Sequence, residues 1–445
     1  MDLKKIIPGL KKFRLWEVFI YESVSQEFVC EGIEEGTTIN KNKLKKEVKE
    51  RTRNVIAIRF SDGRKSGFFA QDFGKKFGKN QISLDKPISE QKLEIPKGAT
   101  KKIRASLGED KDVNQENIDE LLEILFQKAD FKLVIDKVSV GKTTQTRRIV
   151  NSKGLDLVER KTLHFIYGAI GGEKNGQRQI VYFSEYFLFP SKISPHDIAK
   201  KILADFNFDE VRLKAGKFKV IFPPKVAAQI IEFMIENFSA DRIISKLSRF
   251  TERDLGKKVF SDSLSIFELA YPSFDSISGF NKKVQEELKF APGLAYFDDE
   301  GEEKKNFPII KSGVIENFIT HALSAKKLNI QNTACAVRPN PLSPPIPAIS
   351  SLVILPGDES KEKYYSFSDV ILISEIIGLH TSDPIKGDFS VGCRGYIPSA
   401  GKGFKNTTIS GNIFELLKNP IIFDDLSIEG KILTPSILLE GVQVS

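Results

Sequence analysis

The chain has 445 residues, enough for two or three domains with substantial cores, and its 40% hydrophobic and 28% charged residues are typical of a globular protein. No run approaches ~18 uninterrupted apolar residues, and the first residues lack the apolar core of a signal peptide, so no membrane is expected as a partner. The three cysteines are far apart and odd in number, which argues against a disulfide framework and favours a reducing, cytoplasmic location.

The net charge of +8 is unevenly distributed along the chain. Residues 1–110 contain 24 Lys and Arg against 16 Asp and Glu, so they carry the whole excess. The densest cationic run, residues 41–53, has two interpretations: a footprint for nucleic acid or an acidic peptide, or the solvated face of a helix with Leu44 and Val48 one turn apart. Interleaved glutamates and the lack of a known nucleic-acid motif favour the helix, and nucleic acid is not expected as a partner.

Residues 1–100 are predicted to form an N-terminal α/β domain. Apolar residues alternate with others around Trp16 and Val18, as in a strand, and Asp62-Gly63 between two apolar runs predicts a hairpin turn. A polar stretch from about residue 78 to residue 112 predicts a linker to the next domain.

Residues 112–208 are predicted to form a middle α/β domain. It begins with an amphipathic helix at 116–129, and a long hairpin follows. Ser194 then marks the start of a second helix, because serine is a good N-cap and Pro195 suits a first helical turn.

Residues 215–445 are predicted to form the largest domain, with many short strands and few helices. The expected fold class is therefore α+β: two mixed α/β domains followed by a large antiparallel, barrel-like β domain with a few helices. One helix, at 225–238, carries an apolar stripe made of Ala227, Ile230, Ile231, Met234, Ile235 and Phe238. Its opposite side carries Gln229, Glu232 and Glu236, and two carboxylates without a third ligand would hold magnesium or calcium only weakly.

Several further segments act as landmarks for comparison with known families. An acidic turn contains Asp298, Asp299, Glu300 and Gly301; Arg338 ends a Thr-Ala-Cys-Ala-Val-Arg segment; and Gly411 and Asn412 lie in Thr-Ile-Ser-Gly-Asn-Ile. Taken alone, the acidic turn is explained equally well by a cation site or by a solvated loop. Together with the helix at 225–238, and in this order, the segments resemble the TldD/PmbA family, also called the modulator-of-DNA-gyrase family.

The resemblance also indicates a branch of that family. TldD-type chains have His-Glu-x-x-x-His on the helix, whose histidines bind zinc while the glutamate acts as general base. Here the aligned positions are Ile231, Glu232 and Glu236, and residues 424–430 lack the cysteine that supplies the third ligand. The chain is therefore similar to the TldE (PmbA) branch, which implies no metal and no catalytic residue on this chain, with zinc carried by a partner.

The resemblance implies a non-catalytic, metal-free subunit that forms a heterodimer with a TldD-like zinc peptidase and helps to degrade or process unfolded peptides. Two alternatives remain open: a nucleic-acid or gyrase-associated regulator, and a homodimer that serves as a peptide-binding scaffold.

Overall fold

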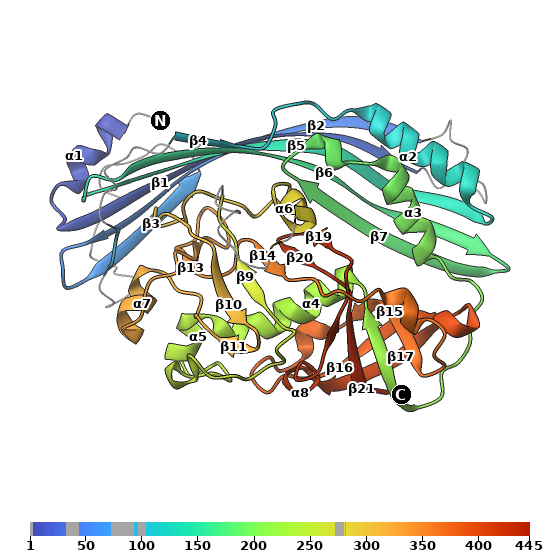
Figure 1. The fold of residues 1–445 in the computed structure, drawn as a ribbon. Helices are drawn as coiled ribbons and strands as arrows, with labels where there is room; N and C mark the ends of the chain where they lie inside the picture. The colour runs from blue at the N-terminus through green and yellow to red at the C-terminus, as the bar shows by residue number, and fades with distance from the viewer. Residues whose placement is uncertain (1–2, 33–43, 73–92, 97–103, 272–279, 281) are drawn as a thin grey trace.

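Two layers of β-structure make up the computed structural model, which describes residues 3–32, 44–72, 93–96, 104–271, 280 and 282–445. An N-terminal sheet arches over a C-terminal body, and both chain ends lie on the outside (Figure 1). The fold class is α+β, as the sequence predicts, and the C-terminal body contains a closed barrel.

The N-terminal sheet has seven strands, ordered β3-β2-β1-β5-β6-β4, with β7 also paired to β6. Only β4 pairs in parallel; the other pairs are antiparallel. Helices α2 and α3 pack against its strands (Figure 1). The elements of this layer are η1 (Leu3–Lys5), α1 (Ile7–Leu10), β1 (Leu15–Glu31), β2 (Lys45–Ser61), β3 (Ser66–Asp72), β4 (Arg104–Leu107), α2 (Gln115–Lys128), β5 (Lys132–Asn151), β6 (Asp156–Lys174), β7 (Gln177–Phe187), η4 (Pro190–Lys192) and α3 (Pro195–Asp205).

This sheet crosses the boundary predicted between residues 1–100 and 112–208. Strand β1 is hydrogen-bonded on one side to β2 and on the other to β5, so both predicted domains contribute to one sheet. Most of the predicted linker at 78–112 lies outside the described residues.

The helix expected in residues 41–53 is wrong, since β2 begins at Lys45 and residues 41–43 lie outside the described part. Residues four apart, such as Leu44 and Val48, lie on the same side of a helix, which has about 3.6 residues per turn. They also lie on the same face of a strand, where every second side chain points the same way, so this spacing does not distinguish the two. Cross-strand pairing decides between them: Lys45 lies opposite Glu31, and Lys49 lies opposite Glu27.

The two ends of strand β1 pack in different clusters. Phe19 packs in a cluster with Phe297 of the C-terminal body. Cys30, at the other end, belongs to the large cluster that includes the buried face of α2. Because side chains alternate across a strand, residues 19 and 30 point from opposite faces, so both faces of β1 are covered along part of its length.

The C-terminal body combines a barrel with a second sheet. In the barrel, β17-β16-β15-β8-β21 closes into a ring through a β17–β21 pairing, and β18 adds to β21; the second sheet is ordered β11-β10-β9-β14-β20-β19. The strands are β8 (Gly216–Phe222), β9 (Ile266–Glu268), β10 (Phe307–Lys311), β11 (Val314–Ile315), β12 (Ala336–Val337), β13 (Ile346–Pro347), β14 (Leu352–Ile354), β15 (Val370–Ile377), β16 (Asp388–Ile397), β17 (Lys402–Asn412), β18 (Ile421–Ile422), β19 (Ser427–Glu429), β20 (Ile432–Thr434) and β21 (Ile437–Val444). The helices are α4 (Pro224–Ile235), η5 (Glu236–Phe238), α5 (Ala240–Ile244), η6 (Glu252–Asp254), α6 (Lys282–Leu288), α7 (Ala322–Leu328), η8 (Lys361–Tyr364), η9 (Leu379–Thr381), η10 (Pro398–Ala400) and α8 (Ile413–Leu416).

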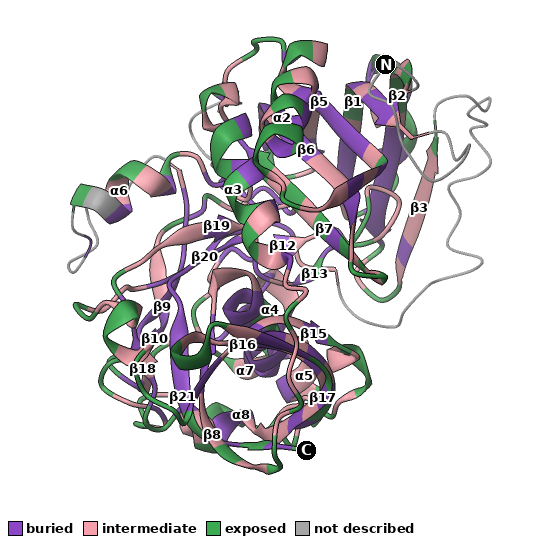
Figure 2. Cartoon of the chain, turned by 90° about the vertical axis from the view of Figure 1, so that its right-hand side faces the viewer, coloured by how far each residue is buried: buried purple, intermediate pink, exposed green. Residues whose placement is uncertain are grey.

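Helix α4 is the central helix of this body. It contacts β8 and β15 of the barrel and β19 and β20 of the second sheet, so most of its circumference is covered. Figure 2 shows it largely buried. The predicted apolar stripe is buried and Gln229, Glu232 and Glu236 are exposed, as expected. Packing on two sides also buries Phe233, which lies outside the predicted stripe.

A buried ionic junction joins the arching sheet to the C-terminal body. Arg59 of β2 donates to Glu17 of β1 (Nε to Oε1, 3.0 Å) and to Glu300 of the body (Nη1 to Oε1, 2.6 Å). Arg338 of the body reaches Glu17 in return (3.1 Å) and stacks over the Phe19 ring (4.3 Å). Burial alone would raise the pKa of Glu300, but Arg59 and His321 outweigh it and hold that pKa below its usual range.

A second part of the junction centres on Arg147 of β5. Its guanidinium forms ion pairs with Glu159 of β6 (2.9 Å) and with Asp299 of the body (2.6 Å). Asp299 also accepts the backbone N–H of Arg338 (2.7 Å), while the neighbouring Asp298 accepts the N–H groups of Glu300, Glu302 and Ala336. The junction therefore links four strands of the sheet to two loops of the body.

Ile231→Ala should lower the free energy of unfolding by about 2–5 kcal/mol, because Ile231 is fully buried in the packed core around α4. Chemical denaturation of both proteins measures the difference. Gln229→Ala, on the exposed side of the same helix, is the control and should change stability by less than ~0.5 kcal/mol. Equal stability of the Ile231 variant and the parent would contradict the packing described here.

Arg59→Met should destabilise the fold by about 3–5 kcal/mol, because it leaves two buried carboxylates without their shared cation. The matched control is Arg53→Met on the same strand, where an exposed pair with Asp72 at 3.6 Å contributes at most ~1 kcal/mol. Denaturant midpoints of the two variants compare the effects directly, and similar midpoints would show that the junction contributes little.

Candidate functional site

A cleft of about 860 Å³ lies between the two layers. Its walls are β7, α3, the first half of α4, and a segment at 425–432 that contains β19. Clefts of this size are typical of small-molecule and peptide sites. Two regions that the sequence suggested separately, the charged edge of α4 and the segment at 424–430, meet in this cleft.

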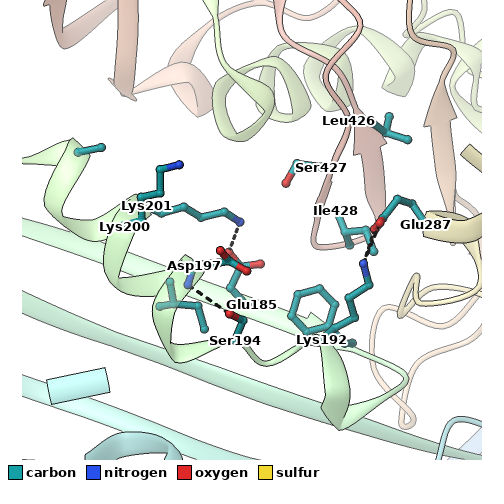
Figure 3. Close-up of a pocket in the computed structure, with 13 residues that line it drawn as sticks. Glu185, Lys192, Ser194, Asp197, Lys200, Lys201, Glu287, Leu426, Ser427 and Ile428 are labelled. Carbon is teal, nitrogen blue, oxygen red and sulfur yellow. Dashed lines mark hydrogen bonds and ion pairs between the residues drawn. The ribbon is translucent and has the colours of Figure 1, made fainter. Parts of the chain in front are cut away.

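An adjoining hollow of about 540 Å³ shares Glu185, Lys201 and the segment at 426–427 with the cleft. Figure 3 shows Lys201 directed toward Glu185, and Lys192 toward Glu287 of α6. Ser194 accepts the N–H of Asp197 there and caps α3, as the sequence predicts. The two hollows follow the side of β7 that faces the C-terminal body.

The three positions aligned with the zinc motif do not converge on one point. Ile231 is fully buried in the core and has no ligand atom. Glu232 lines the cleft and pairs with Lys431 (2.7 Å), whereas Glu236 pairs with Arg242 (3.3 Å). These residues therefore do not fit a zinc ion. In the parts of the chain that the structure describes, no group of three or more His, Cys, Asp or Glu side chains could hold a metal.

The acidic landmark turn belongs to the junction and not to the cleft. Asp298 and Glu300 are buried, and protein donors occupy their carboxylates, so the interpretation as a solvated loop is wrong. Arg338 lies beside them, as described above. Gly301 has φ +88°, a backbone conformation that favours glycine, and a Cβ there would also displace the end of the Leu155 side chain.

The remaining landmarks, Gly411 and Asn412, lie at the end of barrel strand β17. Asn412 accepts the N–H groups of Phe414 and Glu415 and thereby caps α8. Its amide also donates to Lys386 O and Asp388 Oδ1, both at 2.8 Å. A Cβ on Gly411 would lie 3.0 Å from Leu416 Cδ1. Both residues therefore have a structural part in joining β17 to α8.

Sequence reasoning missed the contribution of β7 and α3 to the cleft. Glu185, Lys201 and Asp205 come from these elements, and Glu429 faces them from β19. Burial, with Glu185 adding to it, raises the pKa of Glu429 to about 7. The alternating pattern of β7 predicts a strand, but only the folded chain reveals that this strand is an edge facing the body.

No helix in the described ranges has the length and apolarity needed to cross a membrane.

Comparison with known proteins supports the same family for sequence and fold. Residues 215–445 match the family model for the PmbA/TldA metallopeptidase C-terminal domain. The chain is 25% identical over 362 residues to the uncharacterised protein MJ0231 of Methanocaldococcus jannaschii, covering 79% of this chain and 78% of the relative. It is 23% identical over 307 residues to Metalloprotease PmbA of Escherichia coli O157:H7, covering 66% and 61%.

Two solved structures share the whole fold. TldE from Thermococcus kodakarensis superposes with a TM-score of 0.78 at 18% identity, covering 99% of each chain. A modulator of a DNA gyrase from Thermotoga maritima superposes with a TM-score of 0.77 at 20% identity, covering 100% of this chain and 97% of the other. At these identities the likeness shows a common fold. With the match over residues 215–445, it follows that the chain belongs to the TldD/PmbA family.

Proposed function

We propose that the chain is the metal-free, TldE-type subunit of a two-chain peptidase and pairs with a zinc-bearing TldD-like chain. The observation that carries this proposal is a large cleft beside α4 in which the positions aligned with zinc ligands offer a buried Ile231 and two carboxylates already paired with cations. In this proposal the partner hydrolyses peptides, and this chain forms part of the chamber that admits an unfolded peptide.

The ion pair between Glu232 and Lys431 supports this interpretation. A general base near zinc takes a proton from metal-bound water, which requires the metal to acidify that water. Here the carboxylate aligned with the base has a lysine ammonium at 2.7 Å as its cationic partner. Glu232 is thereby neutralised by the chain's own side chain, and no residue of this chain is assigned a catalytic role.

A nucleic-acid or gyrase-directed role has weaker support. Several cations of β2 have carboxylates nearby: Lys45 and Lys49 lie within 3.8 Å of Glu47, and Arg53 lies 3.6 Å from Asp72. Such pairing reduces the number of free cations that could neutralise phosphates and release counterions.

The isolated, untagged chain is expected to contain no stoichiometric zinc and to cleave no peptide, because α4 offers no imidazole and residues 424–430 offer no thiolate. Inductively coupled plasma mass spectrometry and a fluorogenic peptide assay measure both properties. Near-equimolar zinc together with chelator-sensitive cleavage would contradict the assignment.

Mixing the chain with a purified zinc-bearing family member should give one larger particle with peptidase activity. An obligate pairing buries on the order of 2,000–5,000 Å² and should persist at about 0.5 M salt, which screens contacts between exposed charges. Light scattering after size exclusion gives the mass, and hydrolysis is measured on the same fractions. If the zinc chain is fully active alone and the mass does not rise on mixing, the homodimeric scaffold becomes the better explanation.

A further inference from the structure

Strand β7 is an edge strand whose free side faces the cleft. It pairs with β6 in an unbroken antiparallel register, from Gln177 opposite Lys174 to Phe187 opposite His164. In such a pair the backbone N–H and C=O groups of alternate residues point away from the neighbouring strand. The carbonyls of Ile180 and Tyr182 point away from β6, because they accept hydrogen bonds from Arg394 and Lys225 of the C-terminal body.

The same alternation directs the backbone groups of Ser184 and Tyr186 into the cleft, which both residues line. In the described part of the chain, no backbone or side-chain group pairs with them on that side. Side chains of the body thus cover one half of the edge and leave the other half open. Two open residues in this spacing offer up to four backbone hydrogen bonds to an added strand.

The residues that line the cleft include one more carboxylate than lysines. Its lysines each have a carboxylate partner: Lys201 with Glu185, Lys225 with Asp205, Lys361 with Asp425 and Lys431 with Glu232. Among the described residues Glu429 forms no ion pair, and it accepts a hydrogen bond from Ser427 Oγ (3.0 Å). Lys201 and Lys225 act on its charge from a greater distance, but each is paired with another carboxylate. A partly buried cleft with one more carboxylate than cations favours a positively charged ligand.

Aromatic side chains flank the open edge. Tyr182 is 59% exposed and Tyr186 is 38% exposed, and they lie on the same face of β7, on either side of Ser184. Tyrosine rings at such positions offer contact area to an extended chain and can also stack with a cation.

We propose that the cleft binds an extended peptide segment that carries a basic residue, with the peptide backbone added to β7 at Ser184 and Tyr186 and the cationic side chain paired with Glu429. This inference rests on the proposed function, because it takes an unfolded peptide as the ligand. It adds a location for that peptide on the metal-free chain and a preference for Lys or Arg. The cleft volume of about 860 Å³ accommodates a segment of a few residues.

The test uses the full-length chain and three seven-residue peptides that differ only at the central position, which is Lys, norleucine or Glu. Each peptide carries an uncharged fluorophore, and binding is followed by anisotropy at pH 8, where Glu429 is ionised. The Lys peptide should bind about tenfold more tightly than the norleucine peptide, because a hydrogen bond to a charged group contributes on that order. The Glu peptide should bind most weakly.

Variants then separate the charge from the backbone contribution. Glu429→Gln should bring the Lys and norleucine peptides to within about twofold of each other, since only the charged contact is removed. The control is Glu440→Gln, an exposed glutamate of β21 that lies 3.8 Å from Lys219, and it should keep the full preference. Ser184→Pro should weaken all three peptides by removing an outward N–H, with Ser184→Ala as its control.

N-methylation of alternate peptide backbone nitrogens tests strand addition without altering the protein. One peptide is methylated at its odd-numbered residues and another at its even-numbered residues, and one of these two phases should fail to bind because its methyl groups replace the N–H groups that face β7. Equal affinity for the Lys and norleucine peptides, an unchanged preference in Glu429→Gln, or no loss on N-methylation in either phase would overturn the proposal. A chain that assembles with a zinc-bearing partner but lacks this preference overturns only this inference. A chain that prefers basic peptides but does not assemble overturns only the proposed subunit role.

Discussion

The buried junction between Arg59, Glu17, Glu300 and Arg338 determines how the two layers of this protein sit on each other. Charges removed from water are stable only when each has its partners, so the junction tolerates little displacement of one layer against the other. The cleft is formed by the same two layers at another part of their contact. The ion pairs that join the layers therefore lie outside the cleft itself.

This arrangement changes the meaning of the landmarks that identify the family. Asp298, Glu300 and Arg338 belong to the segments on which the resemblance rests, yet they hold the two layers together and line neither of the two hollows described above. Gly411 and Asn412 likewise have a structural role, because they join the end of β17 to α8. In this chain the landmark residues therefore support the architecture, while the chemistry of the cleft depends on other residues, among them those of α4.

The sequence predicted those features that depend on neighbouring residues in the chain, such as helical periodicity and capping. The apolar stripe of α4, the helix at α2 and the cap at Ser194 follow from periodicity and capping, and the structure has all three. The pattern failed at β2, where a spacing of four suits helix and strand alike and pairing with β1 decides. It also could not reveal the junction, because Arg59 and Glu300 are 241 residues apart in sequence, nor the open side of β7, which depends on what the C-terminal body covers.

The closure of the barrel has a consequence for how the chain folds. Strand β21 lies between β8 and β17, so the ring joins the first strand of the C-terminal body to its last. During synthesis the strands of the arching sheet are all available before β8 emerges, whereas the ring stays open until β21 has been made. Contacts between such distant segments form slowly because a long loop must close first. Until then the apolar face of α4 has an incomplete cover, and apolar surface exposed in this way favours aggregation.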